Sequence, residues 1–228
     1  MKIGILQSGH LPDEFLDDLG DYEQMFHRLL GGRGYEFVTW SVVDDVFPDS
    51  TDEADGWLVT GSKHGAYEDL PWIPKLETLI REIRDSGKPM IGVCFGHQVI
   101  AQALGGKVVK FPAGWALGIQ DYSFEGETLQ LNAWHQDQVV ELPEGAKIVA
   151  TNDFCANAAI AYGDQIYTVQ AHPEFEAEAI DGLIKIRGSA IEDKSLLAEA
   201  TEKLSKQAAN SVLADKFADV FDKARTNE

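Results

Sequence analysis

The first half of the chain alternates short apolar runs, typical of buried strands, with segments in which apolar residues recur every three or four positions, as in helices. The predicted strands cover residues 2–7, 35–41, 56–60 and 89–93. The predicted helices cover residues 15–29, 74–86 and 97–104, and glycine follows each of them. This alternation predicts a mainly parallel sheet with helices on both faces, that is, a three-layer α/β/α arrangement.

After Gly106 the pattern changes to short strands that follow one another closely, which favours antiparallel pairs. These strands are predicted at residues 107–111, 117–124, 128–131, 147–151, 158–162 and 166–170. From residue 175 to residue 224 the apolar spacing is helical again. We therefore expect a single α/β domain over residues 1–228, with antiparallel additions to the sheet and a C-terminal helical extension over about 189–228.

Charge and cysteine content narrow the classes of function. The chain has 38 acidic and 19 basic residues, a formal net charge of −19, which disfavours binding to nucleic acids and to anionic membranes. The acidic stretches 13–23 and 44–55 are typical of a solvated face, with a basic partner as the alternative. Two cysteines give no disulfide framework, and neither a signal peptide nor a membrane span is apparent, so we expect a cytoplasmic protein.

One cysteine stands in a segment that is typical of catalytic turns. A predicted strand runs into Gly92-Val93-Cys94-Phe95-Gly96, and a predicted helix begins directly afterwards. This is the thiol counterpart of the G-x-S-x-G nucleophile turn, which needs small residues two positions before and after the nucleophile. The helix N-terminus favours a thiolate, and the amide of Phe95 could hold an oxyanion. The alternative is that Cys94 is a buried apolar residue without a chemical role.

A cysteine nucleophile needs a base, and His172 is the best candidate among the six histidines. His10 and His27 have no acidic residue at a useful spacing, and His64 and His97 lie in a polar loop and in the first turn of a helix. His172 follows a predicted strand, and Glu174 lies two residues further on, where an extended chain points its side chain the same way. The pattern predicts a Cys–His–Glu triad. No spacing of histidines or cysteines indicates a metal site.

Four segments in this order resemble the class I glutamine amidotransferase family. They are the turn at 92–98, the His172-Pro173-Glu174 segment, the glycine-rich loop at 60–69, and Trp134-His135-Gln136-Asp137, which resembles the family's Ser-His-x-Asp segment. The resemblance covers residues 56–174. It implies a flavodoxin-like fold and no cofactor.

The resemblance also implies roles for individual residues. Cys94 would be the nucleophile, His172 the base and then the acid, and Glu174 the group that orients His172. The oxyanion would meet the amide of Phe95 and one amide from Gly61-Ser62. Gln98 and the backbone around His135 would hold the α-amino acid part of a γ-glutamyl substrate, which would form a γ-glutamyl thioester on Cys94 that water then hydrolyses.

Two departures from the family pattern bear on the substrate. The family loop commonly runs Gly-Gly-Pro, whereas this chain has Gly61-Ser62-Lys63, and Trp134 stands in place of the family's serine. The chain is most similar to stand-alone members that resemble the GMP synthase amidotransferase domain, and plant γ-glutamyl peptidases are in the same group. Residues alone leave three hypotheses open: a self-contained hydrolase of a small γ-glutamyl substrate, a glutaminase that delivers ammonia to a separate synthetase subunit, and a non-catalytic binding or regulatory module. The oligomeric state also stays open.

Overall fold

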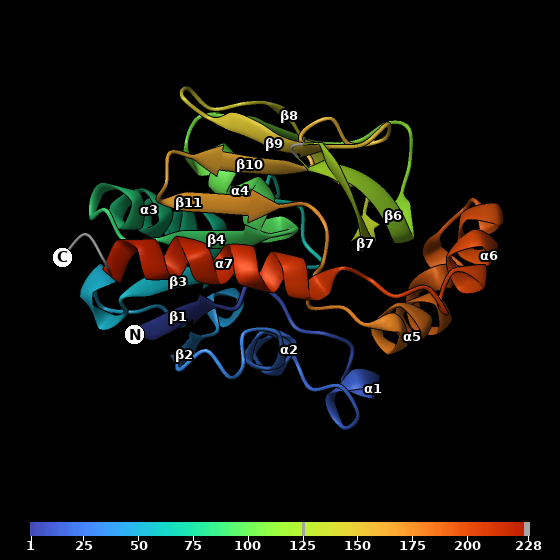
Figure 1. Ribbon diagram of the computed structural model, residues 1–228, viewed down its shortest axis with the longest axis horizontal. Coiled ribbons are helices and arrows are strands. Elements are labelled where there is room, and N and C mark those ends of the chain that lie inside the picture. The colour runs from blue at the N-terminus through green and yellow to red at the C-terminus, as the bar shows by residue number, and fades with distance from the viewer. Residues whose placement is uncertain (125, 226–228) are drawn as a thin grey trace.

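A nine-stranded mixed sheet forms the centre of the protein (Figure 1). The structure is a computed structural model that describes residues 1–124 and 126–225, the last two by their backbone only. The strand order is β2-β1-β3-β4-β11-β10-β9-β6-β7, and the first five strands in that order are parallel. The strands are β1 (Lys2–Leu6), β2 (Glu36–Trp40), β3 (Gly56–Val59), β4 (Met90–Val93), β6 (Ala116–Phe124), β7 (Glu127–His135), β9 (Lys147–Thr151), β10 (Ala159–Tyr162) and β11 (Ile166–Val169).

Helices cover both faces of this sheet, so the predicted three-layer architecture is confirmed (Figure 1). On one face lie α3 (Trp72–Asp85) and α4 (Phe95–Ala103); on the other lie α2 (Tyr22–Leu29) and α7 (Asn210–Arg225). Alternate residues of the strands feed the two layers: Ile91 and Val93 of β4 face α2 and α7, whereas Met90 faces α3 and α4. A hydrophobic core therefore forms on each side of the sheet.

The prediction of one helix over residues 15–29 was wrong. The chain forms a short helix α1 (Asp13–Leu16), a turn, and then α2. Gly20 adopts a φ of +73°, which ends the turn, and the Asp21 side chain caps the new helix by accepting a hydrogen bond from the amide of Tyr22. The side chain of Gln24 accepts in return from the amide of Asp21, which completes a capping box. The apolar residues keep a helical spacing from residue 15 to residue 29, so their pattern does not reveal the break between the two helices.

The antiparallel part is larger than the sequence pattern indicated. β7 extends to His135, beyond the predicted 128–131, and an unpredicted strand β8 (Asp137–Glu141) begins two residues later. β8 pairs with β5 (Lys107–Lys110) in a separate two-stranded sheet. The described residues also form short 3-10 helices at η1 (Val42–Asp44), η2 (Thr51–Glu53) and η3 (Gly188–Ala190).

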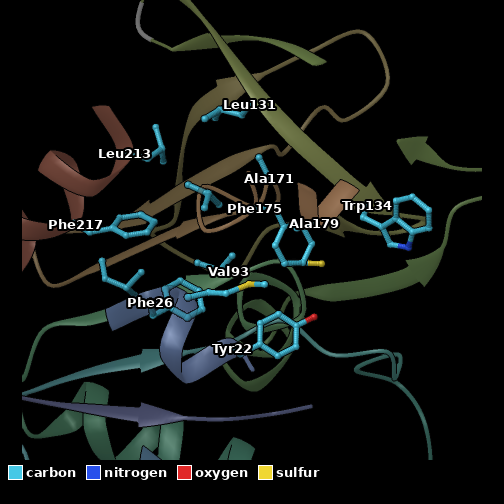
Figure 2. Packing of buried hydrophobic residues seen from close by; sticks show 14 of the residues in the cluster. Tyr22, Phe26, Val93, Leu131, Trp134, Ala171, Phe175, Ala179, Leu213 and Phe217 are labelled. Atoms are coloured by element: carbon cyan, nitrogen blue, oxygen red, sulfur yellow. The ribbon is translucent and has the colours of Figure 1, made fainter. Parts of the chain in front are cut away.

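The C-terminal helices occupy two different places in the fold. α5 (Ala177–Arg187) and α6 (Lys194–Glu202) lie at one end of the molecule, and α6 packs on β6 (Figure 1). α7 instead returns across the parallel strands, where Leu213, Phe217 and Phe221 are fully buried. Figure 2 shows Leu213 and Phe217 packed with Phe26 of α2 over Val93 of β4. No helix among residues 1–124 and 126–225 is long and apolar enough to cross a membrane.

Candidate active site

Cys94 lies in a strained turn between β4 and α4. Its backbone has φ 53° and ψ −104°, so a non-glycine residue occupies the positive-φ region at the start of a helix. A Cβ on Gly96 would stand 2.1 Å from the carbonyl oxygen of Val59, and one on Gly92 would stand 2.8 Å from the backbone of Gly96. Both flanking glycines are therefore required by close backbone contacts, as the sequence pattern predicted.

Backbone hydrogen bonds hold this turn to the neighbouring strands. The amide of Cys94 donates to the carbonyl of Val169 at 2.9 Å, and the amide of Gly96 donates to the carbonyl of Thr60 at 3.1 Å. Cys94 thus lies where β3, β4 and β11 end together, at the carboxyl edge of the parallel strands, where clefts form in this class of fold. Its side chain is 6% exposed, and it lines a cleft.

His172 and Glu174 come together as the sequence predicted. The imidazole Nδ1 lies 2.7 Å from Glu174 Oε1, and both side chains are buried. Phe175 stacks on the His172 ring at a centroid distance of 4.1 Å with the planes 1° apart, which fixes the ring's orientation. With Nδ1 engaged by the carboxylate, Nε2 is the nitrogen that can bond Cys94.

The electrostatics of the site favour a charged His172. Burial lowers the pKa of His172, but Cys94 and Glu174, by their charges and hydrogen bonds, outweigh it and raise the pKa to about 10. By contrast, burial lowers the pKa of His97 and of His135 to about 3, so both stay neutral and are weak bases. Among these three histidines, only His172 has the surroundings that suit proton transfer to and from a thiol.

The glycine-rich loop lies beside the same imidazole. A Cβ on Gly61 would stand 3.1 Å from His172 Cε1 and 3.1 Å from the Tyr22 hydroxyl. The next residue, Ser62, packs against Gly9 of the β1 loop, where a Cβ would come within 2.9 Å of its Cα atom. Phe95 is the first residue of α4, so its amide has no acceptor within the helix. Gly61 therefore lies beside the imidazole of His172, and Phe95 directly follows Cys94.

Sequence reasoning missed Tyr22. Its ring is buried at the start of α2, its centroid is 6.2 Å from that of Phe175, and Figure 2 shows it beside the same cluster. Burial raises the pKa of its hydroxyl well above the usual range, and the charges of Cys94 and Glu174 raise it further. The readable signal was Asp21 followed three residues later by Gln24, which sets a helix start at this tyrosine.

Gln98 and His135, the predicted substrate contacts, both line the cleft. The amide nitrogen of Gln98 donates to the carbonyl of Asp137 at 2.9 Å and to Gln170 Oε1 at 3.1 Å, which fixes the side chain in place. His135 Nδ1 lies 3.3 Å from the Asp137 carbonyl, and its Nε2 has no partner among the described residues. Among the described residues, neither side chain forms a hydrogen bond with the imidazole of His172, whose Nδ1 is bound to Glu174.

The cleft that contains Cys94 has a volume of about 650 Å³. Three cations line it, Lys63, Lys110 and Arg187, and none of them forms an ion pair with a carboxylate in the part of the chain that the structure describes. Glu68 and Asp137 supply negative charge to the same cleft. In a protein with a net charge of −19, cations gathered at one cleft suit a ligand that carries carboxylates.

No group of three or more histidine, cysteine or acidic side chains that could hold a metal ion occurs in the described ranges. The chemistry available beside this cleft is therefore a thiol and an imidazole backed by a carboxylate. That set suits nucleophilic attack on a carbonyl carbon.

Comparison with known proteins agrees with this arrangement. Residues 15–184 match the family described as Glutamine amidotransferase class-I. The chain belongs to this family. It is 34% identical over 181 residues to Gamma-glutamyl peptidase 4 of Arabidopsis thaliana, an alignment that covers 72% of each chain. It is 31% identical over 225 residues to the glutamine-hydrolyzing GMP synthase of Clostridium acetobutylicum, which covers 88% of this chain and 41% of the synthase. These relatives support hydrolase or amidotransferase activity on glutamine-type amides.

The fold is likewise shared with a solved member of the family. A crystal structure of a glutamine amido transferase from Methylobacillus flagellatus superposes with a TM-score of 0.78 at 22% identity, covering 100% of this chain and 94% of the other. This similarity establishes the flavodoxin-like class I architecture that the sequence resemblance implied. The superposition includes the C-terminal helices.

Proposed function

We propose that this protein hydrolyses the γ-glutamyl amide bond of small γ-glutamyl peptides, with Cys94, His172 and Glu174 as a catalytic triad. One observation carries the proposal: His172 is held by a buried carboxylate at 2.7 Å and lies close enough to Cys94 for the charge of that thiol to raise its pKa. Few structural roles require a buried histidine and glutamate paired beside a buried cysteine that lines a cleft. The γ-glutamyl peptidase relatives support the choice of substrate.

Before substrate is attacked, His172 Nε2 has taken the proton of Cys94, which gives an imidazolium beside a thiolate. In the first half of the reaction, this thiolate attacks the γ-carbonyl carbon of the substrate. The carbonyl oxygen becomes an oxyanion, held by the amide of Phe95 and by an amide of the Gly61-Ser62 loop. The imidazolium then gives its proton to the departing nitrogen, the C–N bond breaks, and the amine leaves. A γ-glutamyl thioester on Cys94 remains.

In the second half, His172 takes a proton from a water molecule that attacks the thioester carbonyl. The C–S bond breaks, the proton returns to the sulfur, and glutamate leaves. Glu174 keeps the imidazole in the tautomer that has Nε2 free and stabilises its cationic form in both halves. Gln98 and His135, which line the cleft beside Cys94, would contact the γ-glutamyl group.

The cleft favours a peptide over glutamine. A volume of about 650 Å³ is in the range of sites that enclose drug-sized ligands, and glutamine would leave much of it empty. Lys63, Lys110 and Arg187, which pair with no carboxylate among the described residues, suit a substrate with carboxylates on both sides of the scissile bond. Free, buried Cys94 and Cys155 agree with a reducing, cytoplasmic location, which we include in the proposal.

A second candidate is a glutaminase that supplies ammonia to a separate synthetase. The relatives favour it to some extent, since one of them is a glutamine-hydrolyzing GMP synthase subunit from Archaeoglobus fulgidus, 30% identical over 165 residues. Such a protein would release ammonia from glutamine efficiently only with its partner present. The two candidates therefore differ in what the isolated chain can do.

The deciding experiment incubates the purified chain with glutamine and a panel of γ-glutamyl dipeptides and measures glutamate release. We expect turnover of dipeptides without any partner, and none by Cys94→Ala. Stopping the reaction in acid should leave a γ-glutamyl group on the peptide containing Cys94, detected by mass spectrometry. If the chain hydrolysed glutamine but no dipeptide, and did so only after a synthetase was added, the second candidate would replace the proposal. If Cys94→Ala were as active as the wild type, both candidate functions would be excluded.

A further inference from the structure

One wall of the cleft comes from a segment outside the part of the chain that matches the family. The match ends at residue 184, whereas the cleft is lined by Ile186, Arg187, Ser189, Ala190 and Ile191, where α5 passes into η3. Membership of the family therefore does not say what this wall recognises. Its residues are mostly apolar or small, apart from one arginine.

Lys194 holds this wall in a defined conformation. Its ammonium donates to the carbonyl oxygens of Gly188, Ser189 and Ile191 at 3.0, 3.3 and 2.7 Å, which ties η3 to the start of α6. α6 in turn packs on β6, where a Cβ on Gly118 would stand 2.9 Å from Ala200. Because its carbonyl groups are hydrogen bonded in this way, the segment keeps a fixed conformation and presents a defined surface to the cleft.

Two tryptophans give the cleft an aromatic surface. Trp134 on β7 and Trp115 just before β6 both line the cleft, with ring centroids 6.4 Å apart and planes at 60°. Figure 2 shows Trp134 at the edge of the packed cluster, away from Phe217. Trp134 is the residue that stands in place of the serine of the Ser-His-x-Asp segment. Its neighbour His135 lines the same cleft as Cys94, so the aromatic surface and the nucleophile share one space.

A cleft of about 650 Å³ is larger than a γ-glutamyl group needs, and the rest of a γ-glutamyl substrate is the part that leaves as an amine. We propose that Trp115, Trp134 and the 186–191 wall form a leaving-group subsite for large apolar or aromatic amines, such as a γ-glutamyl dipeptide whose second residue is phenylalanine. This inference rests on the proposed γ-glutamyl hydrolysis and names its substrate class.

Burial of a phenyl ring against these side chains adds binding energy that a glycine leaving group cannot supply. The expected preference for γ-glutamyl-phenylalanine over γ-glutamyl-glycine is at least about tenfold in kcat/KM, as for other apolar pockets. A smaller side chain at residue 134 removes one face of the subsite, while the hydrogen bond between His172 and Glu174, which does not involve Trp134, is kept.

The test measures kcat/KM for both dipeptides with the wild type, Trp134→Ser, Trp134→Phe and Lys194→Met. We expect Trp134→Ser to bring the ratio close to one and to change the value for γ-glutamyl-glycine less than about threefold, with Trp134→Phe in between. Lys194→Met should lower the ratio by loosening the wall. Trp40→Phe is the matched control, because Trp40 packs against Trp57 outside the cleft, with the ring planes 38° apart, and its change should leave the ratio unchanged.

Thermal unfolding of each variant shows whether it is folded, and Trp134→Phe, which keeps an aromatic ring at this position, carries the test if Trp134→Ser does not fold. A wild type without preference, or variants that lose activity on both dipeptides equally while folded, would overturn the subsite and leave the hydrolase intact. Failure to hydrolyse any γ-glutamyl dipeptide would remove the proposed function and, with it, the subsite.

Discussion

The carbonyl oxygen of Val59 stands 2.1 Å from the point where a side chain on Gly96 would begin. The backbone of β3 is therefore in direct contact with the backbone of the first turn of α4. Only a glycine at residue 96 leaves room for the turn that carries Cys94. The contact also lets the amide of Gly96 donate to the carbonyl of Thr60.

Gly96→Ala should destabilise the protein, because backbone cannot yield as a flexible side chain does. We expect a loss of about 1–3 kcal/mol in the free energy of unfolding, measured by urea denaturation. Gly188→Ala is the control, since its Cβ would meet only the side chain of Leu197, at 3.3 Å. Equal stability of the two variants would mean that the contact between β3 and α4 relaxes easily.

The two cysteines should differ in reactivity. Burial raises the pKa of Cys155 to about 12, and its side chain is 1% exposed, whereas Cys94 lines the cleft beside His172. In the native protein, iodoacetamide should modify Cys94 more than about 100-fold faster than Cys155, because the thiolate is the reactive form. Peptide mass spectrometry against time measures both rates, and urea-unfolded protein should show them equal. Equal rates in the native protein would contradict an activated thiol at Cys94.

Glu174 should set the alkaline limit of activity. Because the Cys94 and Glu174 charges raise the pKa of His172 to about 10, the imidazolium that protonates the leaving amine persists through neutral pH and is lost only as the pH approaches that value. In Glu174→Gln one of these charges is gone, so the alkaline limb of kcat/KM against pH should move to lower pH. The rate at neutral pH should fall by about 100-fold or more, by analogy with the loss of an orienting carboxylate. An unmoved limb would show that Glu174 does not act on His172.

His10 should make stability depend on pH. The sequence pattern indicated no acidic residue at a useful spacing from His10, yet its ring nitrogens lie 2.6 Å from Asp21 and 2.8 Å from Asp44. Burial lowers the pKa of His10, but these carboxylates outweigh it and raise the pKa above 6.5. A raised pKa in the folded state contributes stability that is complete below 6.5 and is lost as the pH rises through the folded value.

The measurement is the melting temperature of the wild type and of His10→Gln at about pH 6 and about pH 9. The wild type should lose more stability than the variant over this interval. The loss should be modest, because the His10 side chain is 45% exposed and solvent screens its ion pairs. Parallel melting curves for the two proteins would show that the network does not titrate in this range.

The features that sequence reasoning recovered are those in which local chemistry sets the residue type. Gly92 and Gly96 are dictated by backbone contact at fixed spacing. His172 and Glu174 do meet, but through a turn that the amide of Phe175 closes on the carbonyl of His172, and not through the extended chain that we expected. The order of strands and helices in the parallel half could be predicted from apolar spacing alone.

The features that were missed depend on contacts between distant parts of the chain. Nothing near His10 indicates Asp44, which lies 34 residues away. Tyr22 approaches Gly61 and His172 only once α2 is packed on the sheet. The break before Asp21 could have been recognised from its capping box, but continuous apolar spacing concealed it.

The place of β11 has a consequence for how activity is acquired. It is the last strand in the chain, yet it is inserted between β4 and β10, at the middle of the sheet, and it leads directly to His172. A partly folded chain can form the first four parallel strands and the turn around Cys94 while the nucleophile still lacks its base. During refolding, recovery of enzymatic turnover should therefore follow the closing of the sheet rather than its first appearance, so that catalysis reports the final step of assembly.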